Sequence, residues 1–382
     1  MKKLSLYTLY AFIGLSLLSI LTKSVDKKLI QNTQTATTTT EIQTPKDPIQ
    51  EQLDRMSTDE KIGSLLILGF RGPTINEHIQ TLITKYHVGG VNLLKWNIES
   101  KEQMKKLSSD LQNLYKKDHN NLSFIVAADQ EGGTVVRFKF LNEKTAQPNI
   151  KTIGQAIEVT KTRAKELQEL GVNMNFAPVA DFITNTKSYL YNRTFATTSD
   201  GTIELAKTVA EVYLAQGIMP VYKHFPGYGN STIDPHKSIT IFDGTKEMFD
   251  ENIRVFKNLL QKEKNVPVMT AHIQVPWISS KPATKEKYFM TDVLRDDFDF
   301  QGVVITDDLD MASIGKDQGI NAVESINAGA DMLISTPNDA NHIVVLEALK
   351  KAVEDGTITK ERLDQAAYRV LVLRNKLAEI QE

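Results

Sequence analysis

The stretch of this sequence best suited to chemistry joins a lysine–histidine pair to an aspartate and a second histidine. Lys223 and His224 directly follow the apolar run 218–222. Asp234 and His236 lie in the loop behind them, after a segment broken by proline and glycine. A carboxylate beside an imidazole can hold the ring in one tautomer, and an imidazole titrates near neutral pH, which suits the pair to proton transfer. The pair could instead bind a metal ion, or consist of ordinary polar loop residues.

Charged and polar residues also follow several other apolar runs. They are Asp129, Gln130, Glu131 and Arg137 after 123–128, Asp181 after 173–179, His272 after 266–271, and Asp307, Asp308 and Asp310 after 302–305. A single acidic residue at the end of a strand is often the N-cap of the next helix. Charged residues at four or five strand ends of one barrel converge on a single mouth, so the pattern favours a functional site there.

Eight short apolar runs alternate with amphipathic stretches. The runs are 63–70, 89–94, 123–128, 173–179, 219–222, 266–271, 302–305 and 331–335. The helical patterns are 101–117, 161–170, 203–216, 246–262 and 340–354, and a capping box at 57–60 predicts the start of another helix. Strands that alternate with helices imply a parallel sheet, and eight of them predict an α/β fold, a (β/α)₈ TIM-type barrel. An open doubly wound sheet is the alternative.

The composition is that of an ordinary globular protein. Of 382 residues, 41% are hydrophobic and 24% are charged, which is ample material for a large core. The formal net charge of −2 gives no strong attraction to nucleic acid or to an anionic membrane surface. Cysteine is absent, which excludes disulfides, thiol catalysis and thiolate metal sites. No G-x-G-x-x-G or P-loop pattern indicates a nucleotide site.

The amino-terminal part of the chain differs from the rest. Two lysines precede the uncharged hydrophobic stretch 4–21, which is about the shortest length that spans a membrane. No A-x-A-like cleavage site follows it, so residues 1–23 are interpreted as a signal anchor in preference to a cleaved signal peptide. Residues 24–47 are rich in Thr, Gln and Lys and are expected to form a disordered linker. We therefore expect an extracytoplasmic protein, periplasmic or at the cell surface, with one ordered domain over residues 48–382.

The motifs of this chain resemble those of glycoside hydrolase family 3, specifically its NagZ-type β-N-acetylglucosaminidases. The matching segments are D-Q-E-G-G at 129–133, N-F-A-P at 175–178, N-R-T-F at 192–195, K-H-F-P-G with D-x-H at 223–236, P-A at 282–283, and V-L-R-D-D through G-V-V-I-T-D at 293–307. They span nearly everything from residue 48 onward, in family order. The resemblance implies a (β/α)₈ barrel and a retaining, exo-acting hydrolase that removes terminal N-acetylglucosamine from peptidoglycan fragments.

The resemblance also implies the catalytic roles. A retaining glycosidase needs a carboxylate nucleophile and an acid that protonates the leaving oxygen. Asp307 takes the nucleophile's role, with Asp308 as its main rival and Asp310 as a lesser one. Alternate residues of a strand point to opposite faces, so we expect only one of Asp307 and Asp308 to aim at the barrel axis, Asp308 being structural. His236 is the acid and base, and Asp234 orients and charges it, as the aspartate of a serine-protease triad does.

Contacts to the terminal sugar follow from the same resemblance. They come from Asp129, Arg193, Lys223 and His224, with Arg137 and His272 as weaker candidates. Each has a structural alternative, because the cations could close buried ion pairs and His224 could be a satisfied core histidine. We expect no cofactor, no metal ion and no nucleic-acid partner. The expected protein is a monomer acting on muropeptides or chitooligosaccharides that contain N-acetylglucosamine, tethered to the membrane by its hydrophobic stretch.

Two residues depart from the family pattern. Tyr228 stands where the family usually has a second histidine, and Pro235 where it usually has a serine. A tyrosine donates one hydrogen bond but carries no proton near neutral pH, so we expect Tyr228 to change loop packing and not to abolish activity. Pro235 stiffens the turn, which leaves the mobility of the loop open. The other histidines, expected at the surface, are His78, His87, His119 and His342.

Other functions stay open. On the same fold, phosphate could accept the sugar, because a neutral or cationic His236 repels phosphate less than a carboxylate would. A non-catalytic envelope protein would keep the sugar pocket for binding alone. A metal hydrolase built on Asp234, His236 and His272 is a third alternative. A β-glucosidase is disfavoured, because such relatives usually place a glutamate acid/base in an additional domain.

Overall fold

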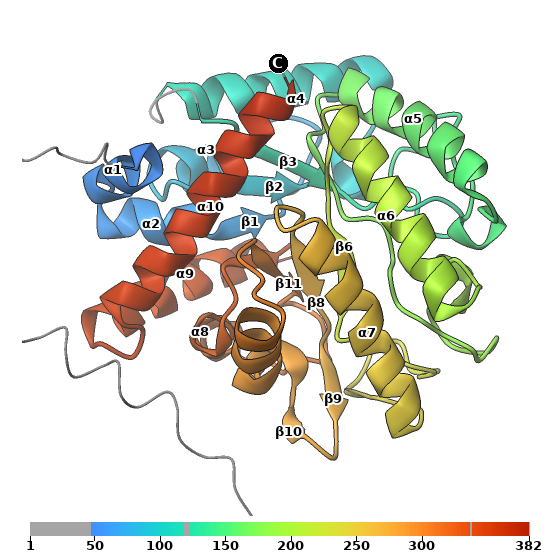
Figure 1. Ribbon diagram of the computed structural model, residues 1–382. Coiled ribbons are helices and arrows are strands. Elements are labelled where there is room, and N and C mark those ends of the chain that lie inside the picture. Colours follow the sequence, from blue (N-terminus) through green and yellow to red (C-terminus); the bar gives the residue numbers. More distant parts are fainter. Residues whose placement is uncertain (1–46, 118–121, 337, 382) are drawn as a thin grey trace, which may run out of the picture. The chain divides into compact units, whose positions relative to one another are not determined.

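A nine-stranded parallel sheet forms the centre of the fold (Figure 1). The computed structural model describes residues 47–117, 122–336 and 338–381. The hydrophobic stretch 4–21 lies outside the described residues, as does the linker apart from Asp47. Among the helices of the described ranges, none combines the length and the apolar character needed to cross a membrane. The anchor and the linker therefore stay predictions.

Each of the eight predicted apolar runs contains or overlaps a strand of this sheet. In sheet order the strands are β5 (Met219–Pro220), β4 (Met174–Asn175), β3 (Ile125–Ala128), β2 (Gly90–Asn92), β1 (Leu66–Leu68), β12 (Met332–Ser335), β11 (Val304–Asp308), β8 (Val268–Thr270) and β6 (Tyr222–Phe225). All neighbouring pairs are parallel. The predicted alternation of strands and helices around a parallel sheet is thus confirmed.

The two ends of the sheet belong to one stretch of chain. Only Val221 separates β5 from β6, and these strands pair with β4 and β8 respectively. A parallel bridge joins Val179 to Lys223, and the amide of Ala180 donates to the carbonyl oxygen of Lys223 at 2.6 Å. The sheet therefore curves round on itself into a nearly closed, TIM-like barrel, and the alternative of an open sheet is wrong.

Helices surround the barrel, as Figure 1 shows. They are α1 (Pro48–Arg55), α2 (Thr58–Ser64), α3 (Glu77–Thr84), α4 (Lys101–Lys116), α5 (Ile153–Glu169), α6 (Ser199–Ala215), α7 (Lys246–Lys262), α8 (Gln318–Ala328), α9 (Asp339–Glu354) and α10 (Lys360–Gln381). The five predicted helical patterns are confirmed in α4, α5, α6, α7 and α9, although α5 begins earlier than predicted. The pattern analysis missed α1, α3, α8, α10 and the π-helical segment η5 (Tyr288–Asp297), which lies between β10 and β11.

The predicted capping box opens α2. The hydroxyl of Ser57 accepts the amide of Glu60 at 3.2 Å, and the carboxylate of Glu60 accepts the amide of Ser57 at 2.7 Å. Two backbone donors that a helix leaves without partners are satisfied in this way. The box therefore sets where the first barrel unit begins, since β1 follows α2 within two residues.

The barrel strands are buried on both faces. Leu66, Ile67 and Leu68 have no exposed surface, and every residue of β3 is buried as well. One face of the sheet meets the barrel interior and the other meets the helices, so parallel strands appear in the sequence as continuous apolar runs.

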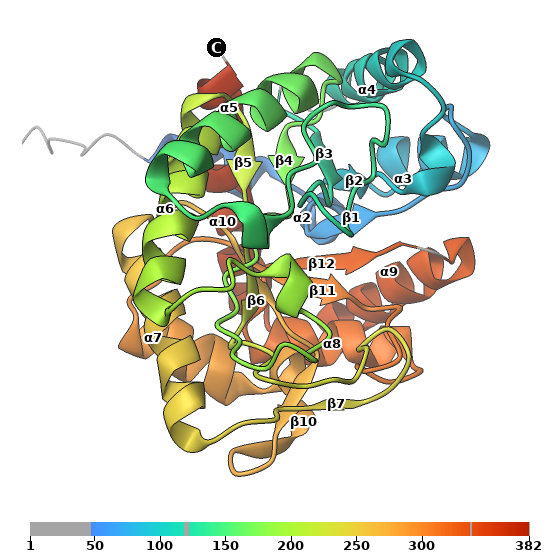
Figure 2. The same ribbon diagram turned by 90° about the vertical axis from the view of Figure 1, so that its right-hand side faces the viewer.

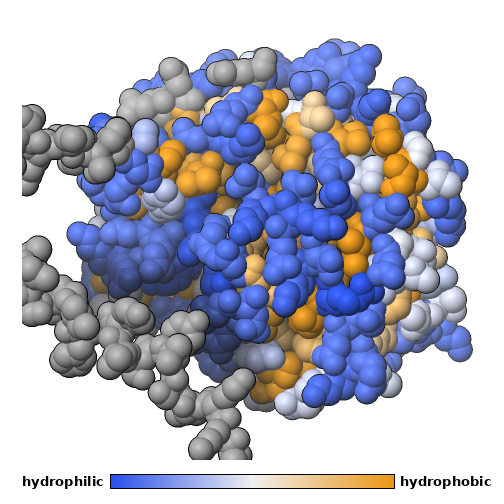
Figure 3. Space-filling model, viewed as in Figure 1, coloured by the Kyte–Doolittle hydropathy of each residue, from blue (hydrophilic) through white to orange (hydrophobic). Residues whose placement is uncertain are grey.

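Figure 3 shows the face seen in Figure 1, where hydrophilic residues cover most of the surface and hydrophobic areas are smaller.

A second, three-stranded sheet holds the loop between β6 and α7. It consists of β7 (Thr240–Ile241), β9 (Ile273–Val275) and β10 (Ser279–Pro282), with β7 parallel and β10 antiparallel to β9. Figure 2 shows β7 and β10 on the same side of the molecule, below β6 in that view. Because β7 belongs to the loop that carries Asp234 and His236, its pairing fastens this loop to the segment after β8.

Candidate active site

A cavity of about 200 Å³ lies at the carboxyl ends of the barrel strands. Seven of the nine residues predicted for the site line it: Asp129, Arg137, Arg193, Lys223, His224, His236 and Asp307. The other two, Asp234 and His272, are not part of the lining, although Asp234 contacts His236. Parallel strands present their carboxyl ends at one mouth, which is why residues far apart in the chain meet here.

Two carboxylates and three cations form one ion-pair network beside the cavity. The Lys223 Nζ lies 2.9 Å from Asp129 Oδ1 and 2.6 Å from Glu131 Oε1. Arg193 binds both oxygens of Glu131, through Nε at 2.8 Å and Nη2 at 2.7 Å. Arg137 Nη2 lies 3.0 Å from Asp129 Oδ2. The cations thus form ion pairs, as the alternative to a sugar-binding role predicted. All three also line the cavity, so they can contact a ligand as well.

The network keeps its members charged although they are buried. Burial alone would raise the pKa of both acids, but the cations outweigh it. Lys223 and Arg137 hold the pKa of Asp129 well below its usual value, and Arg193 and Lys223 lower the pKa of Glu131 to about 2. Burial also disfavours the Lys223 ammonium, yet Asp129 and Glu131 raise its pKa. A ligand in this cavity therefore meets ionised donors and acceptors.

Glu131 and Asp181 are the buried acids that the predicted site omitted. Both follow apolar runs in the sequence and Glu131 also belongs to the D-Q-E-G-G motif, but neither was assigned a role. Asp181 has no exposed surface and accepts three hydrogen bonds, from the His224 amide at 2.9 Å, His224 Nδ1 at 2.9 Å and the Tyr228 amide at 2.8 Å. Because Nδ1 of His224 carries the proton toward Asp181, its Nε2 is the acceptor, and it lies 3.5 Å from Arg193 Nη2.

Tyr228 packs inside the loop. It is 2% exposed, and its ring meets that of His224 edge-on at a centroid distance of 5.3 Å. Its hydroxyl accepts the amide of His272 at 3.3 Å. The residue that replaces the family's second histidine therefore joins the strand-end segments of β6 and β8.

Asp307 and Asp308 end β11, and both border the cavity. Both residues therefore reach the barrel mouth, although strand alternation predicts that only one of them aims at the barrel axis. The pairing of β11 with β12 shifts between Ile305 and Asp308, and the strand ends there, so strict alternation is lost. The two residues still differ, because Asp308 Oδ2 accepts the hydroxyl of Thr336, whereas Asp307 Oδ1 accepts the amide of Asp308 at 2.8 Å.

The two carboxyl groups also differ in ionisation. Burial, with a smaller contribution from Asp310, raises the pKa of Asp308 to about 7. Near neutral pH a large part of Asp308 is therefore protonated, which makes it a poor nucleophile. This favours the predicted assignment of roles to Asp307 and Asp308.

Asp234 and His236 form a tight pair within one turn. Asp234 Oδ1 lies 2.9 Å from Nδ1 of His236 and accepts the amide of the same residue at 3.0 Å. Burial raises the pKa of Asp234, but the His236 amide and imidazole outweigh it, so the pKa lies below its usual value. Since Nδ1 faces the carboxylate, Nε2 is the ring nitrogen that can exchange a proton with a ligand. The hydroxyl of Tyr189, which also lines the cavity, lies 3.4 Å from Nδ1.

His272 lies outside the lining of the cavity. It has no exposed surface, and its ring contacts Thr284 Oγ1 at 2.8 Å and the carbonyl oxygen of Asp308 at 3.0 Å. Burial lowers its pKa, which favours the neutral ring. Among the residues that the structure describes, His272 does not form a metal-binding group with Asp234 and His236. The geometry therefore supports the structural interpretation of His272 and speaks against the metal hydrolase.

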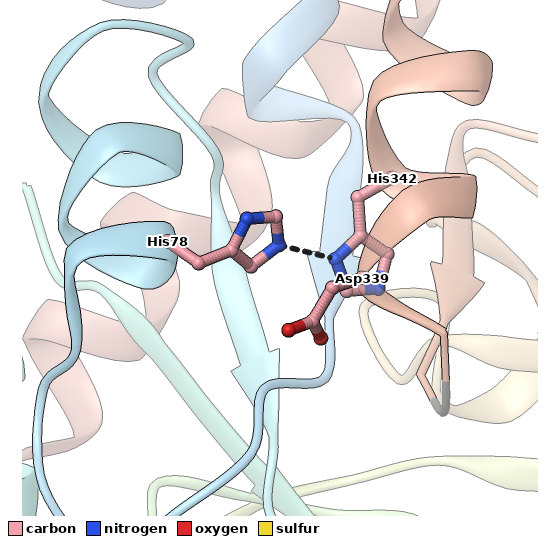
Figure 4. A group of neighbouring side chains, drawn as sticks. All are labelled: His78, Asp339 and His342. Atoms are coloured by element: carbon pink, nitrogen blue, oxygen red, sulfur yellow. Dashed lines mark hydrogen bonds between the residues drawn. The ribbon is translucent and has the colours of Figure 1, made fainter.

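One of the histidines expected at the surface is in the interior. His342 has no exposed surface, and its Nδ1 lies 3.0 Å from Nε2 of His78, which is half-buried (Figure 4). The surface prediction is therefore wrong for His342. Its position on the inward face of α9 explains the burial, since Val345 and Leu346 nearby are buried too. His119 lies outside the described residues.

An α/β barrel with a charged, ligand-sized cavity at the carboxyl ends of its strands defines the general class of this protein. A family model described as the glycosyl hydrolase family 3 N-terminal domain matches residues 57–373. The chain therefore belongs to glycoside hydrolase family 3, and its relatives confirm the resemblance to the NagZ-type members.

Curated relatives carry the name β-hexosaminidase. β-Hexosaminidase A of Pseudoalteromonas piscicida is 27% identical over 369 residues, covering 84% of this chain and 62% of the relative. β-Hexosaminidase of Haemophilus influenzae is 27% identical over 300 residues, covering 75% of this chain and 83% of the relative. This chain thus spans less than two thirds of the first relative and most of the second.

A solved structure shares both the fold and a moderate sequence identity. The family 3 β-N-acetylglucosaminidase from Paenibacillus sp. str. FPU-7 superimposes with a TM-score of 0.79 at 31% identity. The match covers 85% of this chain and 63% of the Paenibacillus chain.

Proposed function

We propose that this protein is a retaining exo-β-N-acetylglucosaminidase with Asp307 as nucleophile and His236, paired with Asp234, as acid and base. The observation that carries the proposal is that Asp307, at the end of β11, and His236, in the loop between β6 and α7, border one cavity. The relatives named β-hexosaminidase support it, above all the Haemophilus influenzae enzyme, which this chain covers over 83% of its length.

The proposed reaction has two steps. In the first, the Asp307 carboxylate attacks the anomeric carbon while the bond to the glycosidic oxygen breaks, and Nε2 of His236 gives its proton to that oxygen. In the second, neutral His236 takes a proton from water, the water oxygen attacks the anomeric carbon, and Asp307 is released. Asp234 stabilises the imidazolium and holds Nδ1, so that the proton is exchanged at Nε2 in both steps.

Recognition of a terminal sugar is assigned to the ion-pair network. Asp129, Lys223 and Arg193 offer charged acceptors and donors, and hydrogen bonds to charged groups are about twice as strong as neutral ones. His224 adds Nε2 as an acceptor, because Asp181 engages its other nitrogen. The cavity of about 200 Å³ is smaller than the roughly 300–1,000 Å³ typical of drug-sized ligands. This volume suits one sugar ring and hence exo action.

The natural substrate that we propose is terminal N-acetylglucosamine on peptidoglycan fragments, encountered outside the cytoplasm. Support comes from the hydrophobic stretch 4–21 and the polar linker that follows it, which are typical of an exported, tethered protein. The proposal for this location rests on the sequence alone.

The test is product analysis with purified muropeptides and with an aryl N-acetyl-β-glucosaminide, each with and without phosphate. A hydrolase releases free N-acetylglucosamine under both conditions. Formation of the sugar 1-phosphate when phosphate is added would identify a phosphorylase, and release of no phenol would leave only a sugar-binding protein. Turnover of the aryl substrate without muropeptide cleavage would overturn the substrate proposal and keep the reaction.

A further inference from the structure

Outside the barrel mouth, two imidazoles and a carboxylate lie together between α3 and α9 (Figure 4). His78 belongs to the first turn of α3, and Asp339 and His342 are three residues apart at the start of α9. Their candidate ligand atoms all lie within 4.8 Å of one another. In the part of the chain that the structure describes, no other group of three acidic or histidine residues is arranged in this way.

The two imidazoles are spaced almost as metal ligands are. Nε2 of His78 and Nδ1 of His342 lie 3.0 Å apart, and the rings stack at a centroid distance of 5.3 Å. Two imidazole nitrogens bound to tetrahedral Zn²⁺, each about 2.0–2.1 Å from the ion, are roughly 3.3 Å apart. The observed spacing is therefore about 0.3 Å short of that of two zinc ligands, and both rings must also turn so that their nitrogen lone pairs meet at the ion.

The carboxylate beside the rings is incompletely satisfied. Asp339 Oδ1 is buried and has no hydrogen-bond partner among the described residues. A buried carboxylate oxygen without a partner is costly, and a cation removes that cost. The unpartnered oxygen is an observation independent of the spacing of the rings.

We propose that His78, Asp339 and His342 bind a divalent transition-metal ion. Two imidazoles and one carboxylate suit Zn²⁺, with solvent in the fourth position. The ion joins α3, which follows the first barrel strand, to α9, which follows the last. Because β1 and β12 are paired in the barrel, the ion fastens the helical layer across the seam between the amino- and carboxyl-terminal parts of the domain.

The proposed site is separate from the cavity but close to the segment after β11, which borders the cavity. None of its three residues lines the cavity. In the same turn of α9, Asn341 donates a hydrogen bond to Asp310, which also accepts the hydroxyl of Ser335 at 2.8 Å. The ion therefore holds the end of α9 that contacts the segment after Asp307, and its expected effect is on stability.

The first test uses the full-length chain, stripped with a chelator and titrated with Zn²⁺ by calorimetry and thermal unfolding. We expect wild type to bind Zn²⁺ and to melt at a higher temperature with it. His78→Gln and Asp339→Asn each should weaken binding by at least about tenfold, since even groups that only orient ligands change affinity 10–100-fold. The control Glu347→Gln removes an exposed charge from the same helix and should bind like wild type. Unchanged affinity in both variants would overturn the proposal.

A second measurement identifies the ligands directly. X-ray absorption at the zinc edge is recorded on His236→Gln, so that the Asp234–His236 pair at the barrel mouth contributes no imidazole. Two imidazoles and a carboxylate oxygen per zinc are expected. A spectrum with one imidazole or none, or failure of this variant to retain zinc, would overturn the proposal even if the variants at the site itself do not fold.

Discussion

Asp234 and His236 act as one unit, because a single carboxylate oxygen holds both the ring and the backbone amide of the histidine. This double contact fixes the ring as well as the turn that carries it. The half-exposed ring can then meet a leaving group at Nε2 without losing its orientation. An imidazole also brings no second negative charge next to Asp307, which a carboxylate acid would do.

The role of His236 predicts a dependence on the leaving group. His236→Ala should lower kcat/KM for muropeptides by about 10²–10⁴-fold and much less for an activated aryl glycoside, because a phenolate departs without a proton. Steady-state kinetics with both substrates measures the difference. Lys237→Ala is the control, since its 3.6 Å ion pair with Asp234 is exposed and contributes little. Equal losses on both substrates would show that His236 is not the acid.

The lowered pKa of Glu131 makes the free energy of unfolding depend on pH, because the charged network stabilises only the ionised carboxylate. Its folded pKa of about 2 lies below the unfolded value of about 4.3, so its stabilisation is complete above the unfolded pKa and is lost as the pH falls through about 2. The shift corresponds to stabilisation on the order of 3 kcal/mol. Urea unfolding between neutral pH and about pH 2 should show Glu131→Gln less stable near neutrality but with a flatter pH dependence than wild type. The exposed Glu102→Gln should keep the wild-type slope, and an equal slope in Glu131→Gln would contradict the assignment.

At the scale of elements, the loop between β6 and α7 is fastened at several points. Its strand β7 pairs with β9, and Asn230 donates its amide to the carbonyl oxygen of Asp243 at 2.7 Å. The amide of Ser313, in the segment after β11, donates to the carbonyl oxygen of Pro235 at 3.2 Å. The proline between Asp234 and His236 thus contacts the same strand-end segment that supplies the proposed nucleophile.

A glycine in this loop tests whether its position matters for activity. Gly229 has a φ of +60°, and a Cβ there would meet the Phe242 ring at 2.7 Å and the carbonyl oxygen of Asp243 at 2.8 Å. Gly229→Ala should therefore shift the loop and lower kcat/KM by about tenfold or more. A tenfold loss corresponds to about 1.36 kcal/mol of activation free energy. Gly356→Ala, at φ +81° with nothing within 4 Å, isolates the backbone cost of about 1–2 kcal/mol. Activity of Gly229→Ala equal to that of Gly356→Ala would show that the loop position is unimportant.

At the scale of the whole molecule, the barrel and most of its mouth could be predicted from the sequence. Strands that are buried on both faces appear in the sequence as continuous apolar runs. The charged residues that follow such runs stand out from their apolar neighbours. Asp129, Lys223 and Asp307 were placed together for this reason. The sequence predicts that the sheet closes into a barrel, but it does not show where. No local pattern marks Val221 as the residue that separates β5 from β6.

Long-range partners could not be predicted. Asp181 and Glu131 matter because they meet His224, Arg193 and Lys223, and none of these pairings has a local signal. His78 and His342 are 264 residues apart and look like separate surface residues until β1 and β12 pair. The irregular end of β11, which brings both Asp307 and Asp308 to the cavity, depends on tertiary packing that outweighs strand alternation.

The most direct measurement of the central claim is the location of a covalent sugar. The enzyme is incubated with a fluorinated N-acetylglucosaminide that has a good leaving group and whose glycosyl-enzyme hydrolyses slowly, then digested and analysed by tandem mass spectrometry. The account predicts a peptide carrying one sugar on Asp307, and no such peptide in Asp307→Ala, which should fold but turn over almost no substrate. A sugar on Asp308, or turnover by Asp307→Ala at the wild-type rate, would contradict it.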